Sequence, residues 1–98
     1  MKKLLITGCN GFLGQRLCAY YKEKYDVIAV GHQDLDICRE DAVQSLFQEV
    51  RPDVVFHTAA ISDTGYSQNH PEESYQVNTL GSVHIALACR EQQTHWFI

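Results

Sequence analysis

Three glycines spaced three residues apart, Gly8, Gly11 and Gly14, follow a short apolar run in the stretch LITGCNGFLGQ. The run at residues 3–7 consists mainly of leucine and β-branched residues, so it predicts a buried strand that ends at Gly8. From Gly11 onward, apolar residues recur at helical spacing as far as Tyr20, which predicts a helix. Glycine is entropically costly in regular structure. The spacing therefore indicates a connection between the strand and the helix in which these positions cannot carry side chains.

Strand-like apolar runs and segments with helical spacing of apolar residues alternate along the rest of the chain. Strands are expected at residues 3–7, 26–30, 53–57 and 95–98. Apolar residues of the 43–50 segment recur at helical spacing, and Pro52 ends that helix. A polar stretch at residues 63–70 predicts a loop, and Pro71 suits the first position of a long helix that reaches about Gln92. This alternation predicts an α/β fold, a Rossmann-like, doubly wound parallel sheet, in one domain over residues 1–98.

Composition excludes several classes of protein. A net charge of −4 gives no electrostatic basis for binding nucleic acid, and no apolar run of 18 residues predicts a membrane span. Four cysteines without a C-x-x-C pair are expected to be small buried hydrophobic residues rather than zinc ligands or disulfides. The five histidines show no metal-ligand spacing, so no metal site is expected. The start MKKLLITG has too short an apolar core for a signal peptide, which predicts a cytoplasmic protein.

Between a strand and a helix, each glycine has a distinct role. Gly8 permits the turn out of the strand, Gly11 lets the backbone approach a ligand, and Gly14 lets the helix lie close to the sheet. The helix then presents free N–H groups and the positive end of its dipole, which suits a pyrophosphate. Three glycines within seven residues can also form an ordinary loop. Their position between the strand and the helix favours dinucleotide binding over that alternative.

At this point the chain resembles a known family. The segment ITGCNGFLG is similar to the T-G-x-x-G-x-x-G loop of extended short-chain dehydrogenases/reductases, the NAD-dependent epimerase/dehydratase superfamily. The resemblance continues through LDI, RPDVVFHTAA and PEESYQVNTLGSVHIALAC, and so covers almost the whole chain. Within the superfamily the chain most resembles dTDP-4-dehydrorhamnose reductases, a group related to other sugar-nucleotide reductases and to the non-catalytic regulatory subunit of methionine adenosyltransferase.

The resemblance implies a set of dinucleotide-binding residues. The glycine loop would hold the pyrophosphate, Asp36 would accept a hydrogen bond from the adenine amine, and small residues after the third strand would line the path to the nicotinamide ribose. Asn78 matches an asparagine that braces the strands near the active site. The implied cofactor-binding residues are Thr7, Gly8, Asn10, Gly11, Phe12, Leu13, Gly14, His32, Asp36, Ile37, Thr58, Ala59, Ala60 and Asn78. Each also has a simpler role open to it: Asp36 as a helix cap, the alanines as packing and Asn78 as a solvated helix residue.

The choice of cofactor depends on the end of the second strand. NAD is usually recognised there by an acidic residue and NADP by an arginine, and residues 30–33 contain neither. Without a repelling carboxylate the site should accept a 2′-phosphate, with His32 or Arg39 as its partner. We therefore expect NADPH as the cofactor, and NADH stays open. His32 can equally be an exposed loop histidine.

Catalytic residues are not expected within this chain. The resemblance implies a Ser or Thr beyond the strand at residue 95 and then a Tyr-x-x-x-Lys pair, and the sequence reaches Ile98 before either. The pair Tyr20 and Lys24 has that spacing, but it is expected on the back of the first helix. We therefore expect the amino-terminal, dinucleotide-binding portion of an NAD(P)H-dependent oxidoreductase, with the catalytic pair and the substrate domain absent and this portion inactive alone.

Three functions are compatible with these residues. The first is the cofactor half of a sugar-nucleotide reductase that transfers hydride from NADPH to a 4-keto-6-deoxy sugar nucleotide in dTDP-rhamnose biosynthesis. The second is a non-catalytic NADP-binding regulatory subunit, and the third is a related epimerase or dehydratase. The expected partners are the nicotinamide dinucleotide and, through the absent part, a nucleotide sugar. No membrane or nucleic-acid partner is expected, and a homodimer is left open.

Overall fold

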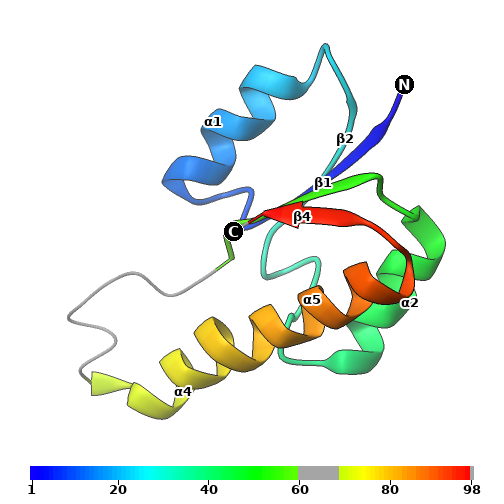
Figure 1. Ribbon diagram of the computed structural model, residues 1–98. Helices are drawn as coiled ribbons and strands as arrows, with labels where there is room; N and C mark the ends of the chain where they lie inside the picture. Colours follow the sequence, from blue (N-terminus) through cyan, green and yellow to red (C-terminus); the bar gives the residue numbers. More distant parts are fainter. Residues whose placement is uncertain (60–68, 98) are drawn as a thin grey trace.

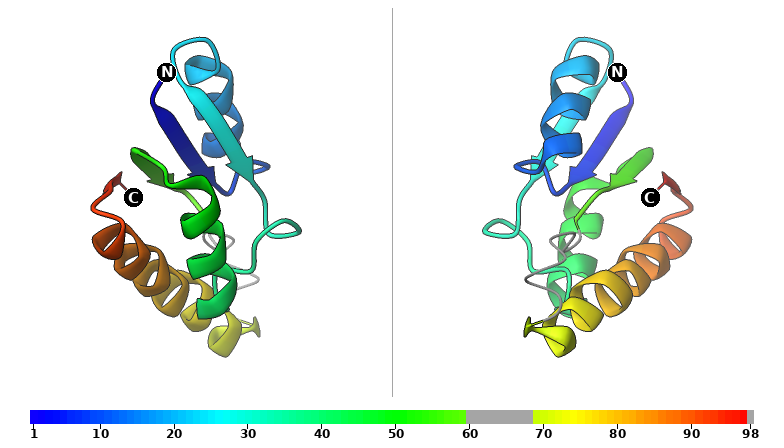
Figure 2. Two further views of the ribbon diagram at one scale, coloured as in Figure 1. Left: turned by 90° about the vertical axis from the view of Figure 1, so that its right-hand side faces the viewer. Right: turned by 90° about the vertical axis from the view of Figure 1, so that its left-hand side faces the viewer.

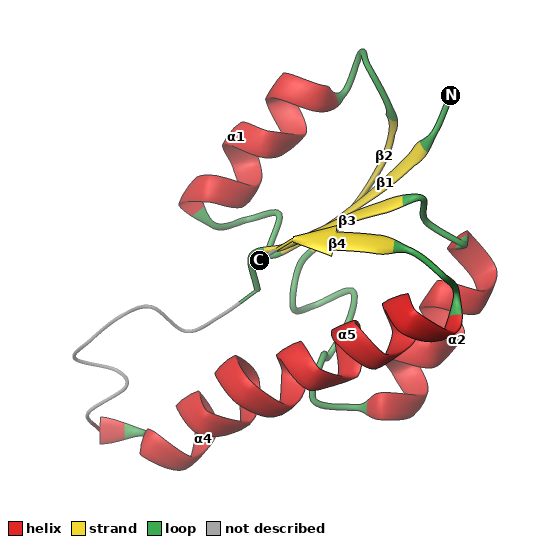
Figure 3. Ribbon diagram, viewed as in Figure 1, coloured by secondary structure: helices red, strands yellow, loops and turns green. Residues whose placement is uncertain are grey.

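A computed structural model describes residues 1–59 and 69–97 of the chain. Within the described residues, strands alternate with helices, and the last helical stretch consists of three consecutive segments, as Figures 1 and 3 show. In chain order they are β1 (Lys3–Thr7), α1 (Phe12–Tyr21), β2 (Asp26–Val30), α2 (Glu40–Val50), β3 (Val54–His57), α4 (Pro71–Tyr75), the π-helix η1 (Gln76–Gly81), α5 (Ser82–Glu91) and β4 (His95–Phe97). The predicted strands are confirmed to within two residues. Most of the loop expected at residues 63–70 lies outside the described residues.

The four strands form one parallel sheet in the order β2-β1-β3-β4. Thr7, the last residue of β1, is in register with Val30 of β2 and with His57 of β3. The chain leaves β1 toward one edge of the sheet, and after β2 it crosses back over β1 to build the other half. The strand order thus reverses between β1 and β3, and ligands of open parallel sheets bind at the carboxyl ends of strands at such a point.

Helices cover both faces of the sheet, as Figure 2 shows, with α1 on one side and α2 and α5 on the other. The larger core lies under α2 and α5, where Leu5 and Val55 of the sheet meet Phe47 and Ile85, all fully buried. The expected doubly wound architecture is confirmed. It leaves the carboxyl ends of the strands as the place where loops can gather.

Helix α2 follows the sequence pattern closely. Its apolar stripe includes the fully buried Val43 and Phe47. Glu40 and Asp41 in the first turn complement the positive end of the helix dipole. The helix ends at Val50, its C-cap Arg51 has a left-handed φ of 50°, and Pro52 follows. This end is as expected, because the residue before a proline is disfavoured in the α region.

The long helix after Pro71 differs from the expectation of one regular α-helix. It ends at Glu91, close to the expected Gln92, but Gln76–Gly81 forms a π-helical segment within it. Gly81 is buried in this segment, and a Cβ at that position would overlap the side chain of Ile37. Glycine weakens a regular helix and here lets this turn lie directly against the loop after β2. Gly81 thus belongs to the π-helical segment and is also the residue at which the helix lies against Ile37.

Several expectations concern side chains outside the sheet. Cys89 is buried as expected, but Cys9, Cys18 and Cys38 are only half-buried, so the expectation of four buried cysteines is wrong. These three lie in a loop, on α1 and in the loop before α2, where the core does not enclose them.

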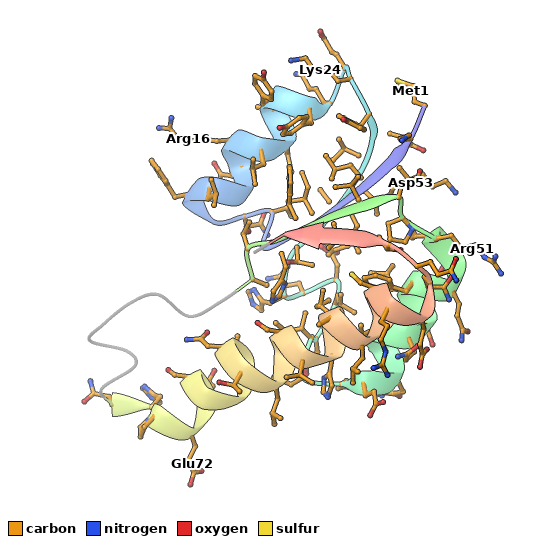
Figure 4. All side chains as sticks on the ribbon, viewed as in Figure 1. Met1, Arg16, Lys24, Arg51, Asp53 and Glu72 are labelled. Atoms are coloured by element: carbon orange, nitrogen blue, oxygen red, sulfur yellow. The ribbon has the colours of Figure 1, made fainter. Side chains whose placement is uncertain are left out.

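Figure 4 shows charged side chains such as Arg16 and Glu72 pointing away from the molecule.

Two properties concern only residues 1–59 and 69–97, the part of the chain that the structure describes. No helix there is long and apolar enough to cross a membrane. No cluster of three metal-ligating side chains occurs among the same residues.

Candidate functional site

A cavity of about 600 Å³ lies at the carboxyl ends of β1, β2 and β3, where the strand order reverses. Its walls come from the glycine loop, the loop after β2, the two residues after β3 and the start of the long helix. The residues that line it are Thr7, Gly8, Asn10, Gly11, Val30, Gly31, His32, Leu35, Asp36, Ile37, Thr58, Ala59, Glu73 and Val77. The position matches that expected for a ligand of a doubly wound sheet.

The glycine loop has the geometry that its spacing predicts. Gly8 has a φ of 68°, which side-chain-bearing residues rarely adopt, and a Cβ there would lie 2.6 Å from Thr58 Oγ1. Gly14 is buried, and a Cβ there would overlap the carbonyl oxygen of Gly8. At Gly11, by contrast, a Cβ would meet only the Gly8 carbonyl oxygen, at 3.4 Å. Gly8 and Gly14 are thus required by the protein itself, whereas Gly11, which lines the cavity as Gly8 does, has room for a Cβ.

Helix α1 begins at this loop without a cap from the protein. Its N-cap is Gly11, which makes no side-chain cap hydrogen bond, and its first turn contains no acidic residue. The first N–H groups of a helix have no partner within the helix and carry the positive end of its dipole. An anion beside Gly11 would satisfy both, so the loop fits a phosphate or pyrophosphate.

A chain of hydrogen bonds joins the ends of β1 and β3. Thr7 Oγ1 accepts from the backbone N–H groups of Thr58 and Ala59, at 3.1 and 3.2 Å. The same oxygen lies 2.7 Å from Nδ1 of His57, and His57 Nε2 lies 3.0 Å from Ser82 Oγ on α5. Thr58 Oγ1 in turn donates to the Thr7 carbonyl oxygen at 2.6 Å. Burial of the imidazole lowers the pKa of His57 below its ordinary value.

The end of the cavity at β2 is built differently. The Gly31 N–H donates to Asp34 Oδ2 at 2.9 Å, which turns the chain sharply after the strand. Asp36 Oδ1 accepts from the Cys38 N–H at 3.0 Å, an Asx turn. The helix N-cap is Arg39, not Asp36, so the capping role that the sequence left open for Asp36 does not apply. Arg39 pairs with Asp41 at 2.9 Å and does not line the cavity, unlike His32.

Nine of the fourteen residues expected from the sequence line this one cavity: Thr7, Gly8, Asn10, Gly11, His32, Asp36, Ile37, Thr58 and Ala59. Phe12, Leu13, Gly14 and Asn78 are not among the lining residues, and Ala60 lies outside the described residues. Phe12 is instead 78% exposed beneath the Arg16 guanidinium, and the Asn78 carbonyl oxygen accepts from Ser82 Oγ at 3.1 Å.

Five lining residues are not in the implied cofactor-binding set, although the first two belong to residues 30–33, where the sequence placed the choice of cofactor: Val30, Gly31, Leu35, Glu73 and Val77. The first three flank residues that the sequence did indicate, so extending the loop after β2 by one or two positions would have found them. Glu73 and Val77 come from the long helix, far along the chain. Their helical spacing of four residues places them on one face, but only the packing of that helix against Ile37 brings that face to the cavity.

The pair Tyr20 and Lys24 lies away from this cavity, as expected. Tyr20 is 61% exposed on α1, and the Lys24 ammonium lies 3.9 Å from the centre of its ring. The two residues form a surface cation–π contact. Neither lines the cavity.

Comparison with known proteins agrees with this geometry. Residues 4–98 match the model of the NAD dependent epimerase/dehydratase family. The chain is 37% identical over 87 residues to a dTDP-4-dehydrorhamnose reductase of Streptomyces griseus and 32% identical over 90 residues to one of Aggregatibacter actinomycetemcomitans. These alignments cover 88% and 90% of this chain but only 29% and 31% of the relatives.

A solved structure matches over the same extent. The crystal structure of dTDP-4-dehydrorhamnose reductase from Bacillus anthracis in complex with NADP superposes with a TM-score of 0.92 at 31% identity. The match covers 98% of this chain and 35% of that one, so the chain spans about a third of the length of the proteins it matches. Because the family model matches residues 4–98, nearly the whole chain, the chain belongs to the NAD dependent epimerase/dehydratase family.

Proposed function

We propose that this chain is the dinucleotide-binding portion of a sugar-nucleotide reductase that uses NADPH. The observation that carries the proposal is the cavity at the ends of β1 and β3, bordered by Gly11 and the uncapped start of α1. Among the described lining residues there is no Lys or Arg. The pyrophosphate would therefore be held by backbone N–H groups and the helix dipole rather than by a cationic side chain.

The lining residues divide the cavity between the parts of the cofactor. Gly8, Asn10 and Gly11 would surround the pyrophosphate, and Thr58 and Ala59 would lie along the path to the nicotinamide. Asp36 and Ile37 would face the adenine, with the carboxylate accepting from its amine. When bound, the cofactor supplies the hydride for the reaction. These residues would bind and orient it, and none of them is proposed to move a proton.

Two observations support NADPH over NADH. His32 lines the cavity just after β2, where a 2′-phosphate would lie, and the similar reductase of Bacillus anthracis was solved with NADP. Asp34, two residues after His32, accepts from the Gly31 N–H through one carboxylate oxygen and does not line the cavity. Arg39, the other partner that the sequence offered, does not line the cavity and pairs with Asp41, so we favour His32. NADH stays open as a weaker ligand.

The activity of the whole protein follows by analogy with its relatives. We propose that the protein containing this chain reduces a 4-keto-6-deoxy sugar nucleotide of the dTDP-4-dehydrorhamnose type, with its catalytic groups outside residues 1–98. A regulatory subunit that binds NADP without chemistry, or an epimerase or dehydratase, is the alternative. We further propose a cytoplasmic protein that binds neither nucleic acid nor membrane, as its charge of −4 favours, with a homodimer left open.

Calorimetry followed by a turnover assay on the whole protein tests these proposals. NADPH should bind, and addition of dTDP-4-dehydrorhamnose should oxidise it, with the loss of absorbance of the reduced nicotinamide as the readout. Binding without turnover of any keto sugar nucleotide would favour the regulatory subunit. Failure to bind either NADPH or NADH would contradict the proposed function itself.

A further inference from the structure

The hydrogen bonds of the Thr7 hydroxyl determine where its proton lies. Its oxygen already accepts from the N–H groups of Thr58 and Ala59, at 3.1 and 3.2 Å. A hydroxyl oxygen has two lone pairs, so both are occupied and only its proton is left to bond. The remaining neighbour is Nδ1 of His57 at 2.7 Å. The Thr7 hydroxyl therefore donates to Nδ1, and that nitrogen carries no proton.

This direction fixes the tautomer of the imidazole. With Nδ1 as an acceptor, a neutral ring carries its proton on Nε2. Nε2 then donates to Ser82 Oγ at 3.0 Å, and the Ser82 hydroxyl donates to the Asn78 carbonyl oxygen at 3.1 Å. Every bond from the loop after β3 to the long helix thus runs in one direction. Bonds arranged in this way polarise and strengthen one another.

Burial leaves the hydrogen bonds of Thr7 and His57 few alternative partners. Thr7 is 1% exposed and His57 2% exposed, so solvent does not readily replace a lost partner. A second proton on the ring would sit on Nδ1 and face a hydroxyl whose lone pairs are both taken. Burial already lowers the pKa of His57 and so favours the neutral form.

We propose that His57, as the neutral Nε2–H tautomer, is a positioning residue for the dinucleotide, an inference that rests on the proposed function. By accepting the Thr7 proton, His57 leaves both lone pairs of Thr7 to the amides of Thr58 and Ala59. Those two residues line the cavity, and His57 itself does not. Without this acceptor the Thr7 hydroxyl must turn to another partner and release an amide, so the wall of the cavity shifts.

Two substitutions of His57 separate the hydrogen bond from the volume of the side chain. In His57→Asn the amide oxygen takes the place of Nδ1 and still accepts from Thr7. His57→Leu offers no acceptor, which leaves a buried polar group without its partner. In the whole protein, His57→Leu should raise the NADPH dissociation constant roughly tenfold. His57→Asn should stay within about threefold of the wild type, since the acceptor is retained.

Val55→Ala is the matched control for a general loss of stability. Val55 lies two residues before His57 on the same face of β3, is fully buried and does not line the cavity. Its truncation should lower stability without weakening NADPH binding under folded conditions. NADPH affinity in His57→Leu equal to the wild type, or an equal loss in His57→Asn and His57→Leu, would overturn the positioning role.

A spectroscopic measurement tests the tautomer without any ligand. Long-range ¹H–¹⁵N correlation of the histidine rings near pH 7 should assign the His57 proton to Nε2. An Nδ1–H tautomer or an imidazolium at that pH would overturn the proposed direction of the hydrogen bonds. A wild-type protein that binds neither NADPH nor NADH would instead contradict the proposed function, so the two failures are distinguishable.

Discussion

The two ends of the cavity are built by different means. At the ends of β1 and β3, the wall is held by backbone geometry and buried hydrogen bonds, such as the left-handed Gly8 and the bond between Thr7 and His57. At the end of β2, the wall consists of a turn held by Asp34 and the exposed side chains of His32 and Asp36. The first end suits what every nicotinamide dinucleotide shares. The second suits what distinguishes one dinucleotide from another.

This difference predicts different responses to mutation. A change at the β1 end alters backbone position and should therefore abolish binding or destabilise the fold. A change at the β2 end alters only a charge near the ligand, so it should shift preference between ligands and leave stability unchanged. Exposed charges interact weakly because water screens them.

Gly11→Val should produce the largest change in binding. The backbone at Gly11, with φ of −78° and ψ of 172°, accepts a side chain, and a Cβ there meets little of the protein. The branched side chain would occupy the space beside the uncapped N–H groups. Loss of two hydrogen bonds to a charged pyrophosphate, each worth about 1.5–3 kcal/mol, should weaken NADPH binding at least about 100-fold by calorimetry.

Gly14→Ala is the matched control in the same loop. Its Cβ would overlap the Gly8 carbonyl oxygen, so it should destabilise the protein by roughly 1–3 kcal/mol in chemical denaturation. Gly11→Val should cost only about 1 kcal/mol, because valine is a poorer N-cap than glycine. Wild-type NADPH affinity in Gly11→Val would mean that the pyrophosphate does not lie at this loop.

The two ends also differ in how far the sequence predicts them. Gly8, Gly11 and Gly14 are local signals, because a strand, a turn and a helix follow one another within a dozen residues. The bond between His57 and Thr7 depends on the register of strands fifty residues apart. Glu73 lines the cavity from a helix that packs against the loop after β2, where Gly81 lies directly against Ile37. Contacts of this kind follow from packing, and the local pattern contains no sign of them.

The buried histidine at the β1 end predicts a pH dependence of stability. Burial lowers the pKa of His57 in the folded state below its ordinary value of 6.5, so the unfolded chain takes up the proton first as pH falls. The contribution of His57 to the free energy of unfolding is therefore full above pH 6.5. It falls as the pH drops toward the folded-state pKa, by at most about 1.4 kcal/mol per pH unit. Below the folded pKa the loss levels off.

His57→Asn removes this titration, and comparison with the wild type cancels the contribution of the other titrating groups. Denaturant unfolding at pH 7 and pH 5 should therefore show a smaller loss of stability on acidification for the variant. Parallel losses in the two proteins would mean that His57 takes up a proton as readily in the folded chain as in the unfolded chain, against the bonding inferred for Thr7.

His32→Asp tests the end of the cavity at β2. A carboxylate at this lining position would repel a 2′-phosphate and accept from a ribose hydroxyl. A charge interaction of about 1–4 kcal/mol near the surface should change the ratio of the NADPH and NADH dissociation constants roughly tenfold in favour of NADH. His32→Asn is the neutral control and should move the ratio much less. An unchanged ratio in His32→Asp would place the 2′ position elsewhere.

The smallest expected effect concerns Cys9, which lies within the glycine loop but does not line the cavity. Thiols react as thiolates, and burial raises the pKa of Cys18 and Cys38 and raises that of Cys89 to about 12. Cys9 is half-buried and next to the start of α1, so it should alkylate faster than these three. NADPH should slow its alkylation by a few-fold, because the flanking Gly8 and Asn10 line the cavity.

Mass-mapped alkylation with and without NADPH measures both effects, with the buried Cys89 as the internal control. Equal labelling of Cys9 in the two conditions would show that its thiol faces away from the ligand, and slower labelling than at the other cysteines would show that it is enclosed.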